Sequence, residues 1–283
     1  MSHSLRSLAA SLLLALAASA GCDTYAGPAF ERQLDRTFTV AAGSTVRVDL
    51  GGGSITTETG PAGSVQVILK QAIDAGSERE AESMAADYEL SAVQTGSEIR
   101  AVSRRKPGVA AHLWQRNGIQ LSARVVVPPD AKLELATSGG SIRVHGDRTA
   151  VVKAQTSGGS VRVDGGSTAA LTLGTSGGSI RVGRALGGLR ASTSGGSITV
   201  DYVGQSNDDV TLDTSGGSIR VGLDTAAAMH VDASTSGGAV RVHDLTFTST
   251  SADKSHASGT INGGGARLRA HTSGGSITIG PAD

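Results

Sequence analysis

Arginine recurs at one fixed place in a phrase that the sequence repeats. The phrase is Thr-Ser-Gly-Gly-Ser-Ile-Arg-Val, which is complete at residues 137–144 and returns with conservative changes from Thr156, Thr175, Thr193, Thr214, Thr235 and Thr272. Counting each Thr as position 0, position +6 holds Arg143, Arg162, Arg181, Arg220 and Arg241, with Thr199 and Thr278 in the other two copies. A guanidinium fits carboxylate and phosphate groups, so an outward column of arginines predicts a binding stripe for an anionic envelope polysaccharide. The alternative is a solubilising column that discourages sheet-to-sheet aggregation.

Cys22 is the second residue with distinctive chemistry. It is the only cysteine, which excludes an internal disulfide and a thiolate metal cluster. It follows residues 8–18, a small and apolar run that is too short to span a bilayer and is typical of an export signal. The sequence Ser-Ala-Gly-Cys at residues 19–22 resembles the lipobox of bacterial lipoproteins, in which the Cys is lipidated and becomes the new amino terminus.

The resemblance to a lipobox implies a signal peptide over residues 1–21 and a lipidated Cys22 on a tether that reaches residue 36. The membrane is then a partner through the lipid anchor. The mature chain is expected at the bacterial cell envelope, either in the periplasm or on the cell surface. The alternative is simple secretion with Cys22 as a free thiol.

Other site chemistries lack the residues that they need. Calcium-binding solenoid turns carry Asp where these turns carry Ser, and the Gly-Lys-Ser/Thr of a phosphate loop does not occur. His145 and His243 share position +8 but stand five copies apart, too far to share a metal at ~4.8 Å per rung. The formal net charge of zero and 2% aromatic content give no reason to expect a nucleic-acid partner. We expect no metal, no cofactor and no enzymatic activity.

The elements that must position the arginines follow from the alternation of apolar residues. Positions −4 and −2 are aliphatic in every copy, as are positions +5 and +7, so each repeat holds two short strands with one buried face each. The Thr at position 0 shares the inward parity of −2. Positions −2 and +5 both face inward but are separated by an odd number of residues, which a flat continuous strand cannot accommodate. The Gly pair between them must therefore form a tight corner or turn.

Two all-β architectures satisfy this parity. In a β-solenoid with rungs of about 16–21 residues, like residues stack on one another. In an antiparallel meander, Gly-Gly is a two-residue hairpin turn. The solenoid is favoured because the phrase recurs almost letter for letter, as expected when each copy packs on its own image.

The region before the regular repeats reads as strands with one short helix. Ser77 and Glu80 fit a capping box ahead of apolar residues at helical spacing, which predicts an amphipathic helix over residues 77–90. Alternating patterns predict strands at residues 37–40, 45–50, 54–58, 64–72, 98–103 and 119–127. Residues 244–257 are Ser/Thr-rich and predict an irregular loop, while residues 256–262 read as a blurred copy of the repeat.

Three stretches together resemble a known family. They are Leu-Gly-Gly-Gly-Ser-Ile at residues 50–55, Val-Val-Val-Pro-Pro at residues 125–129, and the repeated Ser-Gly-Gly-Ser-Ile-Arg-Val. They are similar to the bacterial "putative adhesin" family of unknown function, whose members carry Ser-Gly-Asp-Ile-x-Val-like rungs. The resemblance covers residues 37–283, with strands and helix in 37–130 and regular repeats in 131–283, and it implies a solenoid fold.

These observations predict a non-enzymatic, surface-anchored solenoid that presents a repetitive face for adhesion or scaffolding. Its partner would be an anionic envelope polysaccharide or another protein. The alternative is an accessory or sensor component of envelope-stress signalling, which would bind a ligand and relay to a membrane partner.

Overall fold

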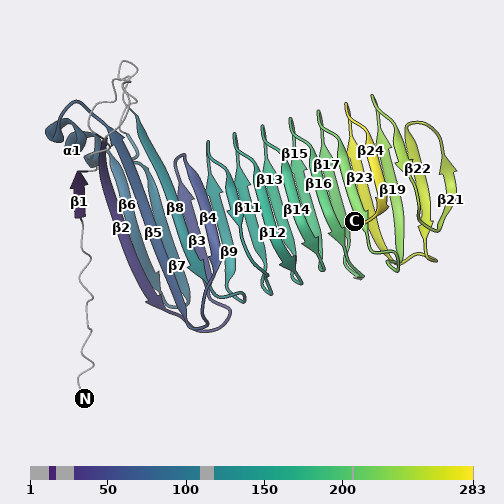
Figure 1. The fold of residues 1–283 in the computed structure, drawn as a ribbon, viewed down its shortest axis with the longest axis horizontal. Coiled ribbons are helices and arrows are strands. Elements are labelled where there is room, and N and C mark those ends of the chain that lie inside the picture. Colours follow the sequence, from purple (N-terminus) through teal and green to yellow (C-terminus); the bar gives the residue numbers. More distant parts are fainter. Residues whose placement is uncertain (1–12, 17–28, 109–117, 206, 283) are drawn as a thin grey trace.

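The repeated phrase forms the corner between two facing parallel sheets of a β-solenoid (Figure 1). A computed structural model of the chain describes residues 13–16, 29–108, 118–205 and 207–282. In each rung, the residues before the corner form a strand of one sheet, sheet B, and the residues after it form a strand of the other, sheet A. The strands of successive rungs pair in parallel and in register, so the solenoid is confirmed and the antiparallel meander is wrong.

Each sheet contains twelve of the described strands. Sheet A runs in the order β1 (Leu13–Leu16), β2 (Ala29–Thr39), β5 (Ser64–Asp74), β8 (Ile119–Val127), β4 (Ser54–Thr59), β10 (Ile142–Val144), β12 (Val161–Ser167), β14 (Ile180–Ala185), β16 (Ile198–Val203), β18 (Ile219–Leu223), β24 (Ile277–Pro281) and β20 (Val240–Val242). Sheet B runs in the order β21 (Phe247–Ala252), β22 (His256–Ile261), β19 (Met229–Thr235), β23 (Ala266–Thr272), β17 (Val210–Thr214), β15 (Leu189–Thr193), β13 (Leu171–Thr175), β11 (Val152–Thr156), β9 (Lys132–Thr137), β3 (Thr45–Leu50), β7 (Glu98–Arg105) and β6 (Tyr88–Thr95).

The core is a thin layer of aliphatic side chains between the sheets. The residues at −4, −2, +5 and +7 are buried throughout, as the parity predicts, apart from Val240 and Val242, which are only half-buried. These two belong to β20, the last strand of sheet A, and therefore lack a neighbour on one side.

Hydrogen bonds between neighbouring rungs explain why the corner keeps the same letters. In the Thr175 corner, the Thr Oγ1 donates to the Gly159 carbonyl of the preceding rung at 2.7 Å and accepts from its own Gly178 N–H at 3.3 Å. The Ser179 N–H donates to Ser160 Oγ of the preceding rung at 3.2 Å. Equivalent bonds occur in the other corners, so Thr at 0 and Ser at +4 each tie one rung to the next.

The Gly at +3 lies too close to its counterpart on the adjacent rung for any side chain to fit. A Cβ built on Gly178 would stand 2.1 Å from the Gly159 oxygen, whereas one on the preceding Gly177 would stand 3.4 Å from the Gly158 oxygen. The first distance is a clash and the second an ordinary contact, so only the second glycine of the pair is required by packing.

The last repeat does not stack at the end of the solenoid. Strands β23 and β24 lie between the rung of β17 and β18 and the rung of β19 and β20, which precedes them in the sequence. The chain therefore passes over one rung position after β18, forms the outer rung, and returns to fill the gap with its final residues. This order differs from the sequential stacking that the repeat predicts.

The outer end of sheet B is closed by a hairpin that the sequence pattern did not reveal. Strands β21 and β22 pair antiparallel with each other, and β22 pairs antiparallel with β19. Residues 247–252 are therefore a strand rather than part of an irregular loop, and residues 256–261 are not a repeat copy. The 16-residue spacing from His256 to Thr272 is consequently not a rung length, and the expected range of 16–21 residues per rung is too wide at its lower limit.

At the other end, sheet A is extended by β8, which pairs parallel with β4, and then by β5 and β2, which pair antiparallel; sheet B is extended by the β6–β7 hairpin. The expected tether over residues 22–36 is wrong for its second half, because residues 29–36 belong to β2, where Phe30 and Leu34 are buried against the core. Strand β1, inside the expected export signal, pairs antiparallel with β2.

The predicted helix is present but shorter than expected. Helix α1 (Glu78–Ala86) begins at the Ser77 cap, whose side chain accepts a hydrogen bond from the Glu80 N–H. Residues 88–90 were expected to continue it but form the start of β6, which is paired along its whole length with β7. No helix among the described residues is long and apolar enough to cross a membrane.

Candidate functional site

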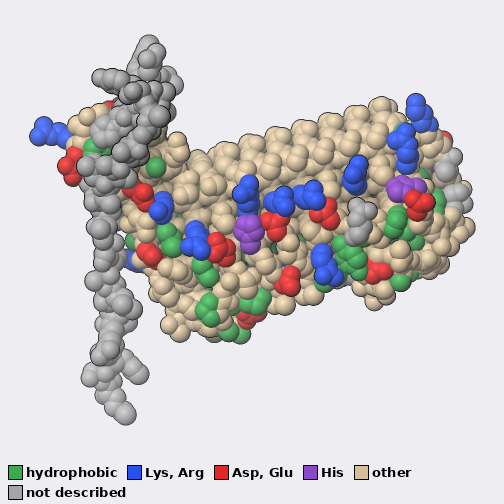
Figure 2. All heavy atoms as spheres, viewed as in Figure 1, with side chains coloured by type: hydrophobic (Ala, Val, Ile, Leu, Met, Phe, Trp, Pro, Cys, Tyr) green, Lys and Arg blue, Asp and Glu red, His purple; other side chains and the backbone are tan. Residues whose placement is uncertain are grey.

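The five predicted arginines lie in one row on the outer face of sheet A. Strand register places Arg143 beside Arg162, Arg162 beside Arg181, and Arg220 one strand beyond Thr199. All five arginines are exposed. Because the last repeat is interposed, Thr278 stands between Arg220 and Arg241. Figure 2 shows these cationic side chains in a line along the face, with Asp and Glu beside part of it.

The row extends two strands further than the sequence predicts. Thr56 of β4 stands beside Arg143, and Arg124 of β8 stands beside Thr56. Thr56 could have been found from the sequence: Leu-Gly-Gly-Gly-Ser-Ile at residues 50–55 resembles the start of the repeated phrase, and counting Leu50 as position 0 places Thr56 at position +6. Arg124 could not, because β8 lies outside the repeat and only the fold places it there. We call the nine residues the position-6 row: Arg124, Thr56, Arg143, Arg162, Arg181, Thr199, Arg220, Thr278 and Arg241.

Carboxylates at position +8 neutralise part of this row. Arg124 forms a two-pronged pair with Glu58, with nitrogen–oxygen distances of 2.8 and 2.6 Å. Arg162 pairs with Asp164, and Arg181 pairs with Asp201 at 2.9 Å. The hydrogen bond from Arg124 lowers the pKa of Glu58 and in turn the pKa of Arg124 is raised, so this pair stays charged over the physiological range.

Three arginines of the row have no such partner. Within the part of the chain that the structure describes, no ion pair or side-chain hydrogen bond is formed by Arg143, Arg220 or Arg241. Exposed ion pairs contribute only about 0–1 kcal/mol each, so even the paired arginines can exchange their carboxylate for another anion. The row is therefore a cationic surface with its unpaired charge at Arg143 and toward the β20 end.

The outer face of sheet B is different in character. Arg47 contacts Glu134 at 2.7 Å and Glu98 at 3.4 Å, and Lys153 lies 4.0 Å from the same Glu134. Acidic and basic side chains pair across neighbouring strands there, so the face carries no single-sign stripe comparable to the position-6 row.

The two histidines at position +8 are farther apart than the sequence indicates. The interposed rung separates His145 and His243 by six strand positions of sheet A instead of five. His145 lies 3.0 Å from Asp164, and His243 lies 2.8 Å from Asp244. Among the described residues, no three His, Cys, Asp or Glu side chains converge as metal ligands would. Cys22 lies outside the described residues, as does most of the expected signal peptide.

The fold defines a two-sheet parallel β-solenoid with a chemically uniform corner. Its sequence over residues 131–280 matches the Toastrack DUF4097 family. That match covers more than half of the chain, and the protein belongs to this family.

Solved structures with a similar course of the chain come from three bacteria. One is a "putative cell adhesion protein" of Clostridium sporogenes, with 13% identity and a TM-score of 0.35 over 87% of this chain and 98% of that one. Others are a "putative adhesin" of Bacteroides fragilis, with 14% identity and a TM-score of 0.29 over 88% and 96%, and one of Parabacteroides distasonis, with 11% identity and a TM-score of 0.30 over 87% and 96%. No curated protein matches the sequence.

Proposed function

We propose that this protein is a non-enzymatic solenoid of the cell envelope that binds an extended anionic polymer along the outer face of sheet A, and so serves in adhesion or scaffolding. The observation that carries the proposal is the position-6 row, nine side chains in register on nine neighbouring strands. At ~4.8 Å per strand the row is about 38 Å long, which suits a chain molecule better than a small ligand.

The composition of the row supports a polyanion as the ligand. Arginine forks bind carboxylate and phosphate groups, and the threonines between them add hydroxyl donors. The unpaired Arg143, Arg220 and Arg241 could bind an anionic group of the polymer directly, because they have no carboxylate partner to release first. Because the six arginines of the row are exposed, binding should weaken steeply with added salt.

Anchoring at the membrane is the second part of the proposal. Lipidation at Cys22 would hold the amino-terminal end of the solenoid near the bilayer. It would leave the outer face of sheet A accessible along its length. Metabolic labelling with a clickable palmitate analogue tests this: label should appear on wild-type protein and be absent from Cys22→Ala, and equal labelling of the two would contradict it.

The binding proposal is tested with purified protein and immobilised polygalacturonate, with dextran as the uncharged polymer. The variant Arg143→Gln/Arg220→Gln/Arg241→Gln removes the unpaired charges of the row. A matched control, Arg100→Gln/Arg190→Gln/Arg269→Gln, removes the same charge from sheet B. Three lost contacts of about 0.5 kcal/mol each predict roughly tenfold weaker binding for the first variant and little change for the control. Equal affinities of the two variants would refute the role of the row.

A further inference from the structure

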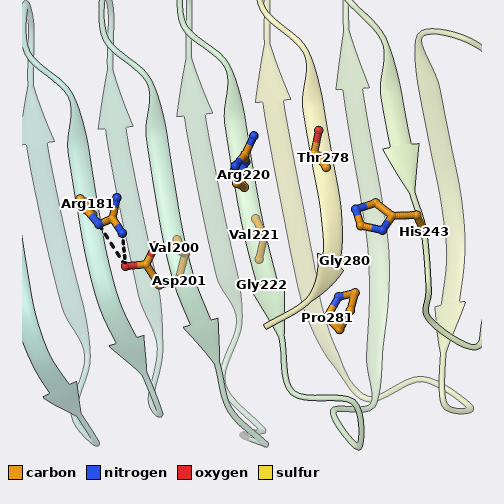
Figure 3. A pocket seen from close by; sticks show the side chains of 10 residues that line it. All are labelled: Arg181, Val200, Asp201, Arg220, Val221, Gly222, His243, Thr278, Gly280 and Pro281. Atoms are coloured by element: carbon orange, nitrogen blue, oxygen red, sulfur yellow. Dashed lines mark hydrogen bonds and ion pairs between the residues drawn. The ribbon is translucent and has the colours of Figure 1, made fainter. Parts of the chain in front are cut away.

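A hollow of about 480 Å³ interrupts the outer face of sheet A near its β20 end (Figure 3). It lies over β16, β18, β24 and β20, which are successive strands of the sheet. The residues that matter for its chemistry are Asp201, Arg220, Gly222, His243, Thr278 and Gly280. Its volume falls within the range of sites for small molecules, about 300–1,000 Å³.

The hollow exists because two neighbouring strands carry glycine at position +8. Gly222 stands beside Gly280, and on the flanking strands the same position holds Asp201 and His243. The two side chains that form the walls are therefore three strand spacings apart, about 14 Å, with backbone as the floor between them.

Neither glycine can be replaced without displacing a wall. A Cβ on Gly222 would lie 2.2 Å from the Asp201 carbonyl oxygen, and a Cβ on Gly280 would lie 2.5 Å from Cε1 of His243. The His243 ring thus rests against the Gly280 backbone and points toward the hollow (Figure 3). The interposed last repeat creates this arrangement, because it brings Gly280 next to Gly222.

Around the floor of the hollow, the acidic side chain is already paired, whereas the basic side chain is not. Asp201 is already bound by Arg181, at 3.0 Å to Nε and 2.9 Å to the terminal nitrogen. Arg220 has no such partner among the described residues. His243 directs Nδ1 to the Asp244 carboxylate at 2.8 Å, which leaves Nε2 for another group.

We infer that this hollow binds one acidic sugar residue. Arg220 and the Thr278 hydroxyl hold its carboxylate or phosphate group, the sugar ring lies on the Gly222–Gly280 floor, and a ring hydroxyl meets His243 Nε2. The inference rests on the proposed function and gives the row a specific site within it: the rest of the row contributes charge along a polymer, and the hollow recognises a unit of that polymer.

The experiment measures binding of monomeric probes to the full chain by nuclear magnetic resonance titration. The probes are galacturonate, glucose 6-phosphate and neutral galactose. The variants are Arg220→Gln, which removes the anion contact, and Arg190→Gln, a matched change of an exposed arginine on β15 of sheet B, outside the position-6 row. We expect saturable binding of at least one acidic sugar, little binding of galactose, at least fivefold weaker binding in Arg220→Gln, and unchanged binding in Arg190→Gln.

The outcomes separate the two claims. Preference for galacturonate identifies a uronate as the bound unit, and preference for glucose 6-phosphate identifies a sugar phosphate; each supports the hollow. If no monosaccharide binds while polygalacturonate still does, the hollow is refuted and the proposed function stands. If neither binds, both are refuted. Equal weakening in the two variants, or galactose binding as tightly as the acids, would also overturn the hollow as a site for an acidic sugar.

Discussion

Gly177 and Gly178, two neighbours in one corner, allow a matched pair of substitutions with different expected results. Alanine at Gly178 would place its Cβ 2.1 Å from the Gly159 oxygen, and alanine at Gly177 would place it 3.4 Å from the Gly158 oxygen. An ordinary contact begins at about 3.4 Å, so Gly178→Ala requires the corner to move by more than 1 Å. Gly177→Ala requires almost no movement.

The magnitude follows from what that movement breaks. Thr175 Oγ1 bonds the Gly159 oxygen at 2.7 Å and accepts from the Gly178 N–H at 3.3 Å. Losing these two bonds at about 1 kcal/mol each, together with about 1–3 kcal/mol for overpacking, predicts that Gly178→Ala lowers the free energy of unfolding by about 3–5 kcal/mol. Gly177→Ala should change it by less than about 1 kcal/mol, and the reduced freedom of the unfolded chain favours the folded state.

Thermal unfolding followed by far-ultraviolet circular dichroism measures both variants. For a chain of this size, we expect the Tm of Gly178→Ala to fall by roughly 6–20 °C and that of Gly177→Ala to stay within about 4 °C of the wild type. The same pair made one rung away, at Gly158 and Gly159, serves as a repeat of the experiment. Similar melting temperatures for the two members of a pair would refute the reading of the corner as a close contact between carbonyl and Cα.

Three further predictions test which side chains of sheet A face the core, the buried charge of Arg148, and the hydrogen bonds of Asp253. Ile180→Asp buries a charge in the core and should prevent folding, whereas Arg181→Ala loses only an exposed ion pair and should change stability by less than about 1 kcal/mol; comparable melting shifts would reverse the inside and outside assignment. Burial lowers the pKa of the Arg148 guanidinium to about 10, so folding disfavours its charged form. Arg148→Met should therefore raise the free energy of unfolding by about 1–2 kcal/mol at pH 8, even though the hydrogen bond from Arg148 to the Ala131 carbonyl is lost. A lower free energy of unfolding for the variant, measured by urea titration, would contradict this prediction. Hydrogen bonds from Ser255 lower the pKa of Asp253 from its usual 3.8. The Asp253 carboxylate therefore stabilises the fold above pH 3.8, and this stabilisation is lost as the pH falls through the lower pKa of the folded state. The melting temperatures of wild type and Asp253→Asn should converge at low pH, and a difference that does not change with pH would contradict the prediction.

The corner and the inward faces could be predicted from the sequence because they depend on parity alone. Alternation before and after the Gly pair determines which side chains meet between the sheets, and the outward position of Arg143 follows from the same count. The order of the rungs could not be predicted. Every copy offers its neighbours the same hydrogen bonds, so nothing local to residues 266–280 states which rung they join.

The candidate site divides in the same way. The five arginines of the repeat were found, because they share one position. The hollow was not found, because it depends on Gly280 lying beside Gly222, and those residues become neighbours only in the folded order. The hairpin of β21 and β22 was missed because small polar residues such as Ser249 and Thr250 show no strong alternation, although β21 pairs with β22 on both sides of a register shift between Ser249 and Ser251.

The interposed last repeat also determines where an additional repeat could be inserted into the solenoid. A repeat duplicated between β9 and β17 would lengthen the position-6 row and leave both ends intact. A repeat appended after Pro281 could not pair with β24, which already has a partner on both sides; the edge strand of sheet A at this end is β20. Pro281 helps to line the hollow, so an affinity tag attached directly after it would crowd the hollow, while one at the far end of the solenoid, beside β2, would not. The rung that comes last in the sequence, β23 and β24, is thus an internal rung of the solenoid.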